Sequence, residues 1–327
     1  MSLYYDDGQA AFYLGDVREV LRDLAAESVH CVVTSPPYWG LRDYGEQGQL
    51  GLEATPGEYV AAMVDVFREV RRVLRADGTL WLNLGDSYAA TTRGAGGEGK
   101  QHSNGGSVLR DRTWRVPNAL KPKDLVGIPW RVAFALQADG WWLRSDIIWH
   151  KPNSMPESVT DRPTKSHEHM FLLAKSERYY YDAAPIREKN EGGPSWGGQF
   201  AVTKAAVAQG RHGPNSIHQP GNAHRRHALR TNGRNKRDVW SIPTTPFPGA
   251  HFATFPPELI KPCILAGSPE GGVVLDPFLG SGTTAMVAKS LGRRAVGIDL
   301  NAEYLEMAKR RCAQMALELA PTDEGAA

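Results

Sequence analysis

The carboxyl-terminal part of the chain alternates short apolar runs with amphipathic segments, and this alternation constrains the fold more than any other feature. Apolar spacing predicts helices over 257–266, 282–291 and 302–319, and β-branched runs predict strands over 272–275 and 294–298. Strands that alternate with helices pair in parallel, with helices on both faces of the sheet. We therefore expect an α/β fold with a largely parallel sheet.

The amino-terminal half repeats this pattern. Strands are predicted over 11–14, 29–34 and 79–84, and helices over 17–26 and 56–75. The second of these helices follows Thr55 as a candidate N-cap, with Glu58 at the capping-box position. The chain is therefore expected to build strands of one sheet from both of its ends.

A helix over 124–138 and strands over 141–149 and 169–174 complete the regular elements. No helix is predicted between these two strands. Parallel neighbours need a long crossover connection, so we expect this pair to be antiparallel.

Two stretches lack periodicity. Residues 89–118 are rich in glycine and indicate a mobile loop, and residues 183–250 are rich in Gly, Pro, Asn, His and Arg. Between Arg187 and Asp238 ten basic residues stand against three acidic ones, which leaves a local surplus of seven positive charges. Such a surplus suits a polyanion. The basic side chains that we assign to this contact are Arg225, Arg226, Arg230, Arg234, Lys236 and Arg237.

The first motif with chemical content is Thr34-Ser35-Pro36-Pro37-Tyr38-Trp39, which directly follows the predicted strand 29–34. Proline has no N–H for a strand ladder, so the pair ends the strand. In α/β sheets the carboxyl ends of the strands are where ligands bind. A hydroxyl, two rigid prolines and two aromatic rings at that place predict a cradle for a flat, polar group.

The second motif is Asp276-Pro277-Phe278-Leu279-Gly280-Ser281-Gly282-Thr283, between a predicted strand and a predicted helix. The N–H groups of such a turn can hold a strongly polar ligand group, and Asp299 at the tip of the next strand is placed to bind ribose hydroxyls. No lysine follows the glycines, which excludes a P-loop. Asp276 would repel a pyrophosphate but suits a cation. A ribose-bearing cation with an amino-acid tail is S-adenosylmethionine; a tight turn without a ligand is the alternative.

The two motifs, in this order, resemble the amino-group DNA methyltransferases of the β class, in which the catalytic half precedes the cofactor half. The resemblance covers nearly the whole chain. It implies a Rossmann-like, S-adenosylmethionine-dependent methyltransferase fold with a mostly parallel seven-stranded sheet and one antiparallel strand. It also implies a catalytic half at 1–182, an irregular target-recognition segment at 183–250 and a cofactor-binding half at 251–327.

The resemblance further assigns roles to individual positions. The catalytic residues are Ser35, Pro36, Pro37 and Tyr38. The residues assigned to S-adenosylmethionine are Asp16, Thr254, Phe255, Asp276, Pro277, Phe278, Gly280, Ser281, Gly282, Thr283, Asp299 and Leu300. The residues assigned to the base and the DNA, beside the basic side chains above, are Trp39, Trp149 and Lys151. The expected partners are double-stranded DNA and a cognate restriction endonuclease.

These assignments predict methyl transfer to an exocyclic amine of a base flipped out of the duplex. In this family serine at the first cradle position usually accompanies cytosine N4 and aspartate accompanies adenine N6. Ser35 therefore favours cytosine N4, with adenine N6 as the alternative. Methylation of cytosine carbon 5 would need a cysteine nucleophile, and Pro262-Cys263 lies within a predicted helix far from the cradle. A nicotinamide oxidoreductase would leave the cradle unexplained, and a DNA-binding module without catalysis would leave its Ser-Pro-Pro-Tyr sequence unexplained.

Metal and membrane functions find little support in the composition. Three cysteines, an odd number without paired spacing, do not suggest disulfides or a zinc site. The histidines His212, His218, His224 and His227 are irregularly spaced and fit the basic segment better than a metal site. No apolar run approaches the roughly 20 residues of a membrane span, and no signal peptide is evident, so we expect a cytoplasmic protein.

Overall fold

The structure, a computed structural model, describes residues 2–41, 45–46, 48–89, 120–189, 233–245 and 255–318. The chain divides into two compact units, one formed by Met1–Asp182 with Asp238–Ala327 and the other by Ala183–Arg237. Nearly all of the predicted loop at 89–118, most of the segment at 183–250 and the predicted frayed tail lie outside the described residues. Among the described residues, no helix combines the length and the apolar character that a membrane span needs.

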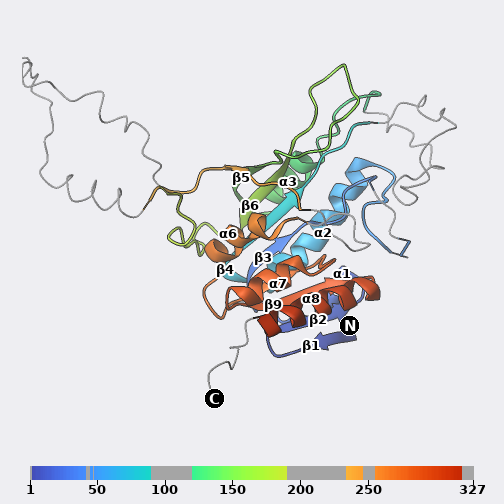
Figure 1. Cartoon of the computed structure of the whole chain (residues 1–327). Helices are drawn as coiled ribbons and strands as arrows, with labels where there is room; N and C mark the ends of the chain where they lie inside the picture. Colours follow the sequence, from blue (N-terminus) through green and yellow to red (C-terminus); the bar gives the residue numbers. More distant parts are fainter. Residues whose placement is uncertain are drawn as a thin grey trace, which may run out of the picture. The chain divides into compact units, whose positions relative to one another are not determined.

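The first unit contains one nine-stranded sheet in the order β1-β2-β9-β8-β3-β4-β6-β5-β7 (Figure 1). Its strands are β1 Ser2–Asp6, β2 Ala10–Leu14, β3 Val29–Thr34, β4 Leu74–Leu84, β5 Trp142–His150, β6 His167–Ala174, β7 Val239–Ser241, β8 Val273–Asp276 and β9 Arg294–Asp299. The predicted α/β class is confirmed, and so is the antiparallel pairing of β5 with β6.

The predicted count of seven strands with one antiparallel strand is wrong. Two short strands are added at the edges of the sheet, β1 and β7, and β1 as well as β6 runs against the others. A hairpin turn creates the first of them, because the side chain of Asp7 accepts hydrogen bonds from the N–H groups of Gln9 and Ala10. Strands this short and exposed carry no periodicity that a sequence pattern could reveal.

Strand β4 begins at Leu74, ahead of the predicted start at Thr79. Leu74 pairs with Val29 and Thr79 pairs with Cys31, so residues 75–78 bulge out opposite a single residue of β3. The Asp77-Gly78 pair, which directly follows the region of the helix predicted over 56–75, therefore lies inside this bulge. A bulge leaves the pairing on both of its sides intact, which keeps the end of β4 in register with the end of β3.

Helices form two layers (Figure 1). They are α1 Val17–Asp23, α2 Pro56–Val73, α3 Ile128–Ala138, α6 Pro257–Gly267, α7 Thr283–Ser290 and α8 Ala302–Glu318. Helices α1, α2 and α3 pack next to one another, and α6, α7 and α8 form the second set. The start of α3 differs from the predicted position because the carboxylate of Asp86 accepts hydrogen bonds from the N–H groups of Gly127 and Ile128.

The capping box of α2 is present as predicted. The Thr55 hydroxyl accepts a hydrogen bond from the N–H of Glu58 at 3.1 Å, and the Glu58 carboxylate accepts one from the N–H of Thr55 at 3.1 Å. Thr55→Ala is expected to lower the free energy of unfolding by about 1 kcal/mol, measured by urea denaturation. Thr55→Ser keeps the capping hydroxyl and should stay close to wild type; an equal loss in both variants would contradict the capping role.

The sheet brings distant parts of the sequence to one edge. The carboxyl ends of β3, β4, β8 and β9 lie at this edge because these strands are parallel. The amino end of β6 lies there too, because β6 is antiparallel to β4. Both sequence motifs follow strands that end at this edge.

Candidate active site

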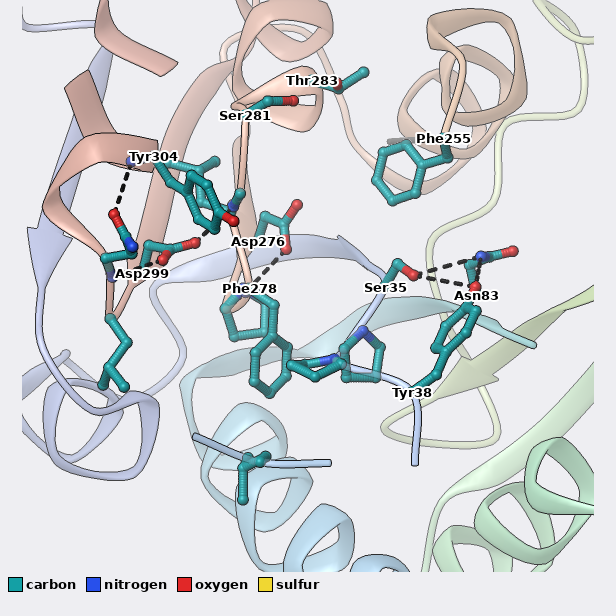
Figure 2. Close-up of a pocket in the computed structure, with 18 of the residues that line it drawn as sticks. Ser35, Tyr38, Asn83, Phe255, Asp276, Phe278, Ser281, Thr283, Asp299 and Tyr304 are labelled. Atoms are coloured by element: carbon teal, nitrogen blue, oxygen red, sulfur yellow. Dashed lines mark hydrogen bonds between the residues drawn. The ribbon is translucent and has the colours of Figure 1, made fainter. Parts of the chain in front are cut away.

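A cavity of about 740 Å³ lies at this edge of the sheet, and residues of both motifs line it. The predicted site residues in its lining are Asp16, Ser35, Pro36, Pro37, Tyr38, Trp149, Lys151, Phe255, Asp276, Pro277, Phe278, Gly280, Ser281, Thr283, Asp299 and Leu300. Figure 2 shows Ser35, Tyr38 and Asn83 close together at one end, with Asp299 and Tyr304 at the other and Asp276 between them. The two motifs, more than two hundred residues apart in sequence, therefore share one cavity.

Asp276 ties the two motifs together. Its carboxylate accepts hydrogen bonds from the hydroxyl of Thr34 at 2.6 Å, from the hydroxyl of Thr284 at 2.7 Å and from the N–H of Phe278 at 3.1 Å. The residue is only 2% exposed. Burial raises the pKa of Asp276 to about 6, against the lowering effect of these hydrogen bonds. The carboxylate is thus held in place by neutral donors.

Asp299 is the second carboxylate of the cavity, and it is half-buried. It accepts hydrogen bonds from the N–H of Gly280 at 2.8 Å and from the N–H of Asn301 at 2.9 Å. Burial raises its pKa to about 6, and the nearby charge of Asp276 adds to the rise. One buried and one half-buried carboxylate, both bound by neutral groups, create a negative potential that suits a positively charged ligand with hydroxyl groups.

The opposite end of the cavity holds a polar network. The Tyr38 hydroxyl donates to the Glu168 carboxylate at 2.9 Å, and the Asn83 amide donates to the same carboxylate oxygen at 3.0 Å and to the Tyr38 oxygen at 2.7 Å. The Ser35 hydroxyl donates to the Tyr38 oxygen over a long contact of 3.4 Å. Lys151 forms an ion pair with Glu168, and its ammonium lies 4.1 Å from the centre of the Trp149 ring.

Several predicted site residues lie elsewhere. Trp39 is buried in the core, and its indole N–H donates to the carbonyl of Glu53 at 2.9 Å. Gly282 is not among the cavity-lining residues and instead supports the turn before α7. Thr254, Arg225, Arg226 and Arg230 lie outside the described residues, as do the four histidines of the basic segment.

Asp16 lines the cavity and also has a partner of its own, and two of the predicted basic residues have a partner within the second unit. Asp16 caps α1 and pairs with Arg18, whose hydrogen bonds lower the pKa of Asp16. In the second unit, Glu188 pairs with Arg234 at 2.9 Å and with Arg237 at 3.1 Å. Lys236 belongs to the same unit.

The sequence prediction missed three groups of the site. They are Asn83 and Glu168, which join the network, and Tyr304, which lines the cavity. Asn83 is the one polar residue in the apolar run 80–84, and this isolation is the signal that could have identified it. Cys263 lies buried inside α6, as the sequence predicted, and does not line the cavity.

Comparison with known proteins decides the family. A family model described as DNA methylase, whose name covers N6 and N4 methyltransferases, matches residues 29–310. The chain belongs to this family of DNA methylases. The methylase is 49% identical to the type II methyltransferase M.SmaI of Serratia marcescens, over 91% of this chain and 89% of that protein. It is 48% identical to M.Cfr9I of Citrobacter freundii, over 92% and 87% respectively.

Solved structures support the fold of the methylase. The PvuII DNA methyltransferase, described as cytosine-N4-specific, aligns with a TM-score of 0.62 at 18% identity, over 95% of this chain and 88% of that one. A putative DNA modification methylase from Thermus thermophilus, solved with S-adenosyl-L-methionine, aligns with a TM-score of 0.55 at 27% identity, over 93% and 94%. The methylase therefore has the S-adenosylmethionine-dependent methyltransferase fold, and S-adenosylmethionine is its cofactor.

The cavity of the methylase fits this cofactor. S-adenosylmethionine carries a sulfonium, an ammonium and a ribose with two hydroxyls, and Asp276 and Asp299 provide two carboxylates in the lining. We expect cofactor affinity to fall about tenfold between pH 7 and pH 5 for each of the two carboxylates that the cofactor needs in ionised form, because about a tenth of a carboxyl group with a pKa near 6 is ionised at pH 5. Isothermal titration calorimetry at constant ionic strength measures this change. An affinity that stays constant from pH 5 to pH 8 would contradict it.

The cofactor-free methylase should show the opposite trend in stability. Both carboxyl groups have a higher pKa in the folded state than the ordinary value of 3.8. Their contribution to stability is therefore complete below about pH 3.8 and is lost as the pH rises through about 6. The rise in melting temperature caused by the cofactor should consequently be larger at pH 7 than at pH 5.

Proposed function

We propose that this methylase is a type II, site-specific DNA methyltransferase that transfers a methyl group from S-adenosylmethionine to the N4 amine of cytosine in duplex DNA. The observation that carries the proposal is the placement of Ser35 in the same cavity as Asp276 and Asp299. The Ser35 hydroxyl, which can contact an amine, thereby lies in the same cavity as a negatively charged site that can bind a cationic methyl donor. The similarity to M.SmaI and M.Cfr9I, both type II methyltransferases, supports the class.

The acceptor amine is a weak nucleophile, because its lone pair is delocalised into the ring of the base. Hydrogen-bond acceptors aimed at its two hydrogens make the nitrogen more tetrahedral. The oxygen of Ser35 and the carbonyl of Pro36 are the candidates, and the proline pair fixes the direction of that carbonyl. Bound S-adenosylmethionine supplies an electrophilic methyl group. Catalysis then depends on the alignment of the amine more than on a strong base.

The target base has to leave the duplex to reach the cavity. Tyr38, whose ring lines the cavity, is the proposed stacking partner, and Trp149 and Lys151 lie in the same lining. A serine rather than an aspartate at position 35 favours cytosine N4, and transfer to adenine N6 is the second candidate.

The second unit is proposed to contact the DNA. Arg234 and Arg237 both pair with Glu188, whose carboxylate they share. Exposed ion pairs of this kind contribute about 0–1 kcal/mol, so a phosphate can replace the glutamate at small cost. Phosphate contacts position a protein on DNA, and the recognition sequence depends on other contacts in the segment 183–250. A cognate restriction endonuclease belongs to the proposal because the named relatives are type II methyltransferases.

The test is product analysis. The protein is incubated with labelled S-adenosylmethionine and duplex DNA, the DNA is digested to nucleosides, and the labelled nucleoside is identified. We expect N4-methylcytosine. N6-methyladenine would overturn the choice of base, and 5-methylcytosine would overturn the mechanism. Stabilisation by S-adenosylhomocysteine but not by NAD in a thermal-shift assay separates this function from that of a nicotinamide oxidoreductase.

A further inference from the structure

Glu168 is a nearly buried charge in the wall of the cavity, and the proposed chemistry does not use it. Its side chain is 16% exposed, and that of its partner Lys151 is 18% exposed. One carboxylate oxygen pairs with Lys151, and the other accepts from the Tyr38 hydroxyl at 2.9 Å and the Asn83 amide at 3.0 Å. A charge is costly to bury unless it is paired and hydrogen-bonded, so this arrangement calls for a role.

An ionised carboxylate only accepts hydrogen bonds, which fixes the direction of every bond in the network. Tyr38 has a single hydroxyl hydrogen, and it points to Glu168. The Tyr38 oxygen can then only accept, which it does from the Asn83 amide at 2.7 Å. Its contact with Ser35 at 3.4 Å must therefore use the hydrogen of the Ser35 hydroxyl.

The orientation of Asn83 supports this polarity. Its amide oxygen is buried and makes no hydrogen bond with the described part of the chain. Turning the amide over would place that oxygen against the Glu168 carboxylate, where two acceptors repel, and would compete with Glu168 for the hydrogen of the Tyr38 hydroxyl. An unsatisfied buried acceptor costs about 1–3 kcal/mol, so the orientation is maintained by the bonds that the nitrogen makes to Tyr38 and Glu168, with a longer one to the Ser35 oxygen at 3.5 Å.

We propose that Glu168 is a positioning residue that acts through Tyr38 to turn the hydroxyl hydrogen of Ser35 away from the substrate, so that an oxygen lone pair faces the target amine. The inference rests on the proposed function, because it gives a direction to the hydrogen bond between Ser35 and the amine. Lys151 keeps Glu168 in its acceptor state. Burial alone would raise the pKa of Glu168, but Lys151 and the hydrogen-bond donors hold it below its ordinary value. The long Ser35 contact is of the kind that tightens when substrate binds.

The sharpest test is a double-mutant cycle with Glu168→Gln and Tyr38→Phe. In the glutamine variant the side-chain amide can donate to the Tyr38 oxygen, and Ser35 loses its fixed polarity. We expect the single-turnover rate of methyl transfer to fall about 100-fold in E168Q, while the dissociation constant for S-adenosylmethionine changes less than about twofold. Because Glu168 acts through the Tyr38 hydroxyl, the double variant should be no slower than Y38F alone. The inference would be overturned if the rate losses of the two single variants multiplied in the double variant. It would also be overturned if E168Q lost affinity for S-adenosylmethionine and kept its rate of methyl transfer.

The matched control is Glu157→Gln. Glu157 pairs with Arg162 at 2.6 Å, has a side chain that is 32% exposed and does not line the cavity. This variant should methylate at the wild-type rate. If E168Q does not fold, the cycle of Ser35→Ala with Tyr38→Phe tests the same relay: the double variant should equal S35A, and independent effects would overturn the inference. Product analysis of the wild type separates the failure of this inference from the failure of the proposed function. If the wild type makes N4-methylcytosine but the two substitutions act independently, only the positioning role of Glu168 is contradicted.

Discussion

Ser35→Ala is expected to slow methyl transfer by about 100-fold or more, with binding of S-adenosylmethionine unchanged. Ser35 lies at the end of the cavity that holds Tyr38 and Asn83, away from Asp299 (Figure 2). Its oxygen is proposed to interact with the amine most strongly when the nitrogen becomes tetrahedral. An interaction made in the transition state alone lowers kcat and kcat/KM equally, so KM for DNA should stay near its wild-type value. Single-turnover kinetics with saturating cofactor measures the effect.

Two other serines provide controls for this prediction. Ser28 is exposed and remote from the cavity, and Ser28→Ala should leave the rate unchanged. Ser281 lines the cavity within the glycine motif and accepts a hydrogen bond from Arg311 at 2.8 Å. Ser281→Ala should weaken cofactor binding rather than slow the chemical step. Full turnover by the Ser35→Ala variant would remove Ser35 from its proposed role.

Sequence periodicity was sufficient to predict that the two motifs meet. Each motif follows a strand of the expected parallel sheet, and parallel strands end at the same edge. The hydrogen bond from Thr34 to Asp276 shows how closely β3 and β8 bring them together. The cavity-lining residues that belong to the two motifs could consequently be predicted from the sequence.

Glu168 was missed because the start of strand β6 and the consequence of its antiparallel direction were not recognised. The sequence predicted the strand over 169–174, but β6 begins at His167. In an antiparallel strand the amino end reaches the edge where its neighbours finish, so the first residues of β6 are those that enter the site. Patterns of apolar residues locate the middle of a strand well and its ends poorly. The residues at a strand end are often polar on both faces, so they show no alternation of apolar and polar positions.

Trp39 was misplaced for a different reason. An aromatic residue beside a proline pair can face either the ligand or the core, and the sequence does not determine the side-chain direction. Tyr38 faces the cavity network, while Trp39 turns inward to the carbonyl of Glu53. The core of the first unit therefore uses one of the two aromatic rings of the motif at 34–39.

Gly282→Ala is expected to produce the largest loss of stability and to weaken cofactor binding at least tenfold. Gly282 has a φ of +80°, and a β-carbon added to it would lie 2.6 Å from Cβ and 2.8 Å from Cα of Ala308 on α8. The left-handed backbone costs an L-residue about 1–2 kcal/mol. The forced separation of α7 from α8 adds about 1–3 kcal/mol. The same movement displaces the Gly280 N–H that binds Asp299. Urea denaturation and calorimetric titration with S-adenosylmethionine measure the two effects.

Gly8→Ala separates the two causes. Gly8 has the same φ of +80°, but a β-carbon there would have no atom within 4 Å. This variant therefore carries only the backbone cost, and its cofactor affinity should be that of the wild type. The difference between the two variants measures how far the glycine turn depends on close packing of α7 against α8. If Gly282→Ala bound the cofactor as tightly as Gly8→Ala does, the glycine would serve the turn alone, and the distance between these helices would have no part in shaping the site.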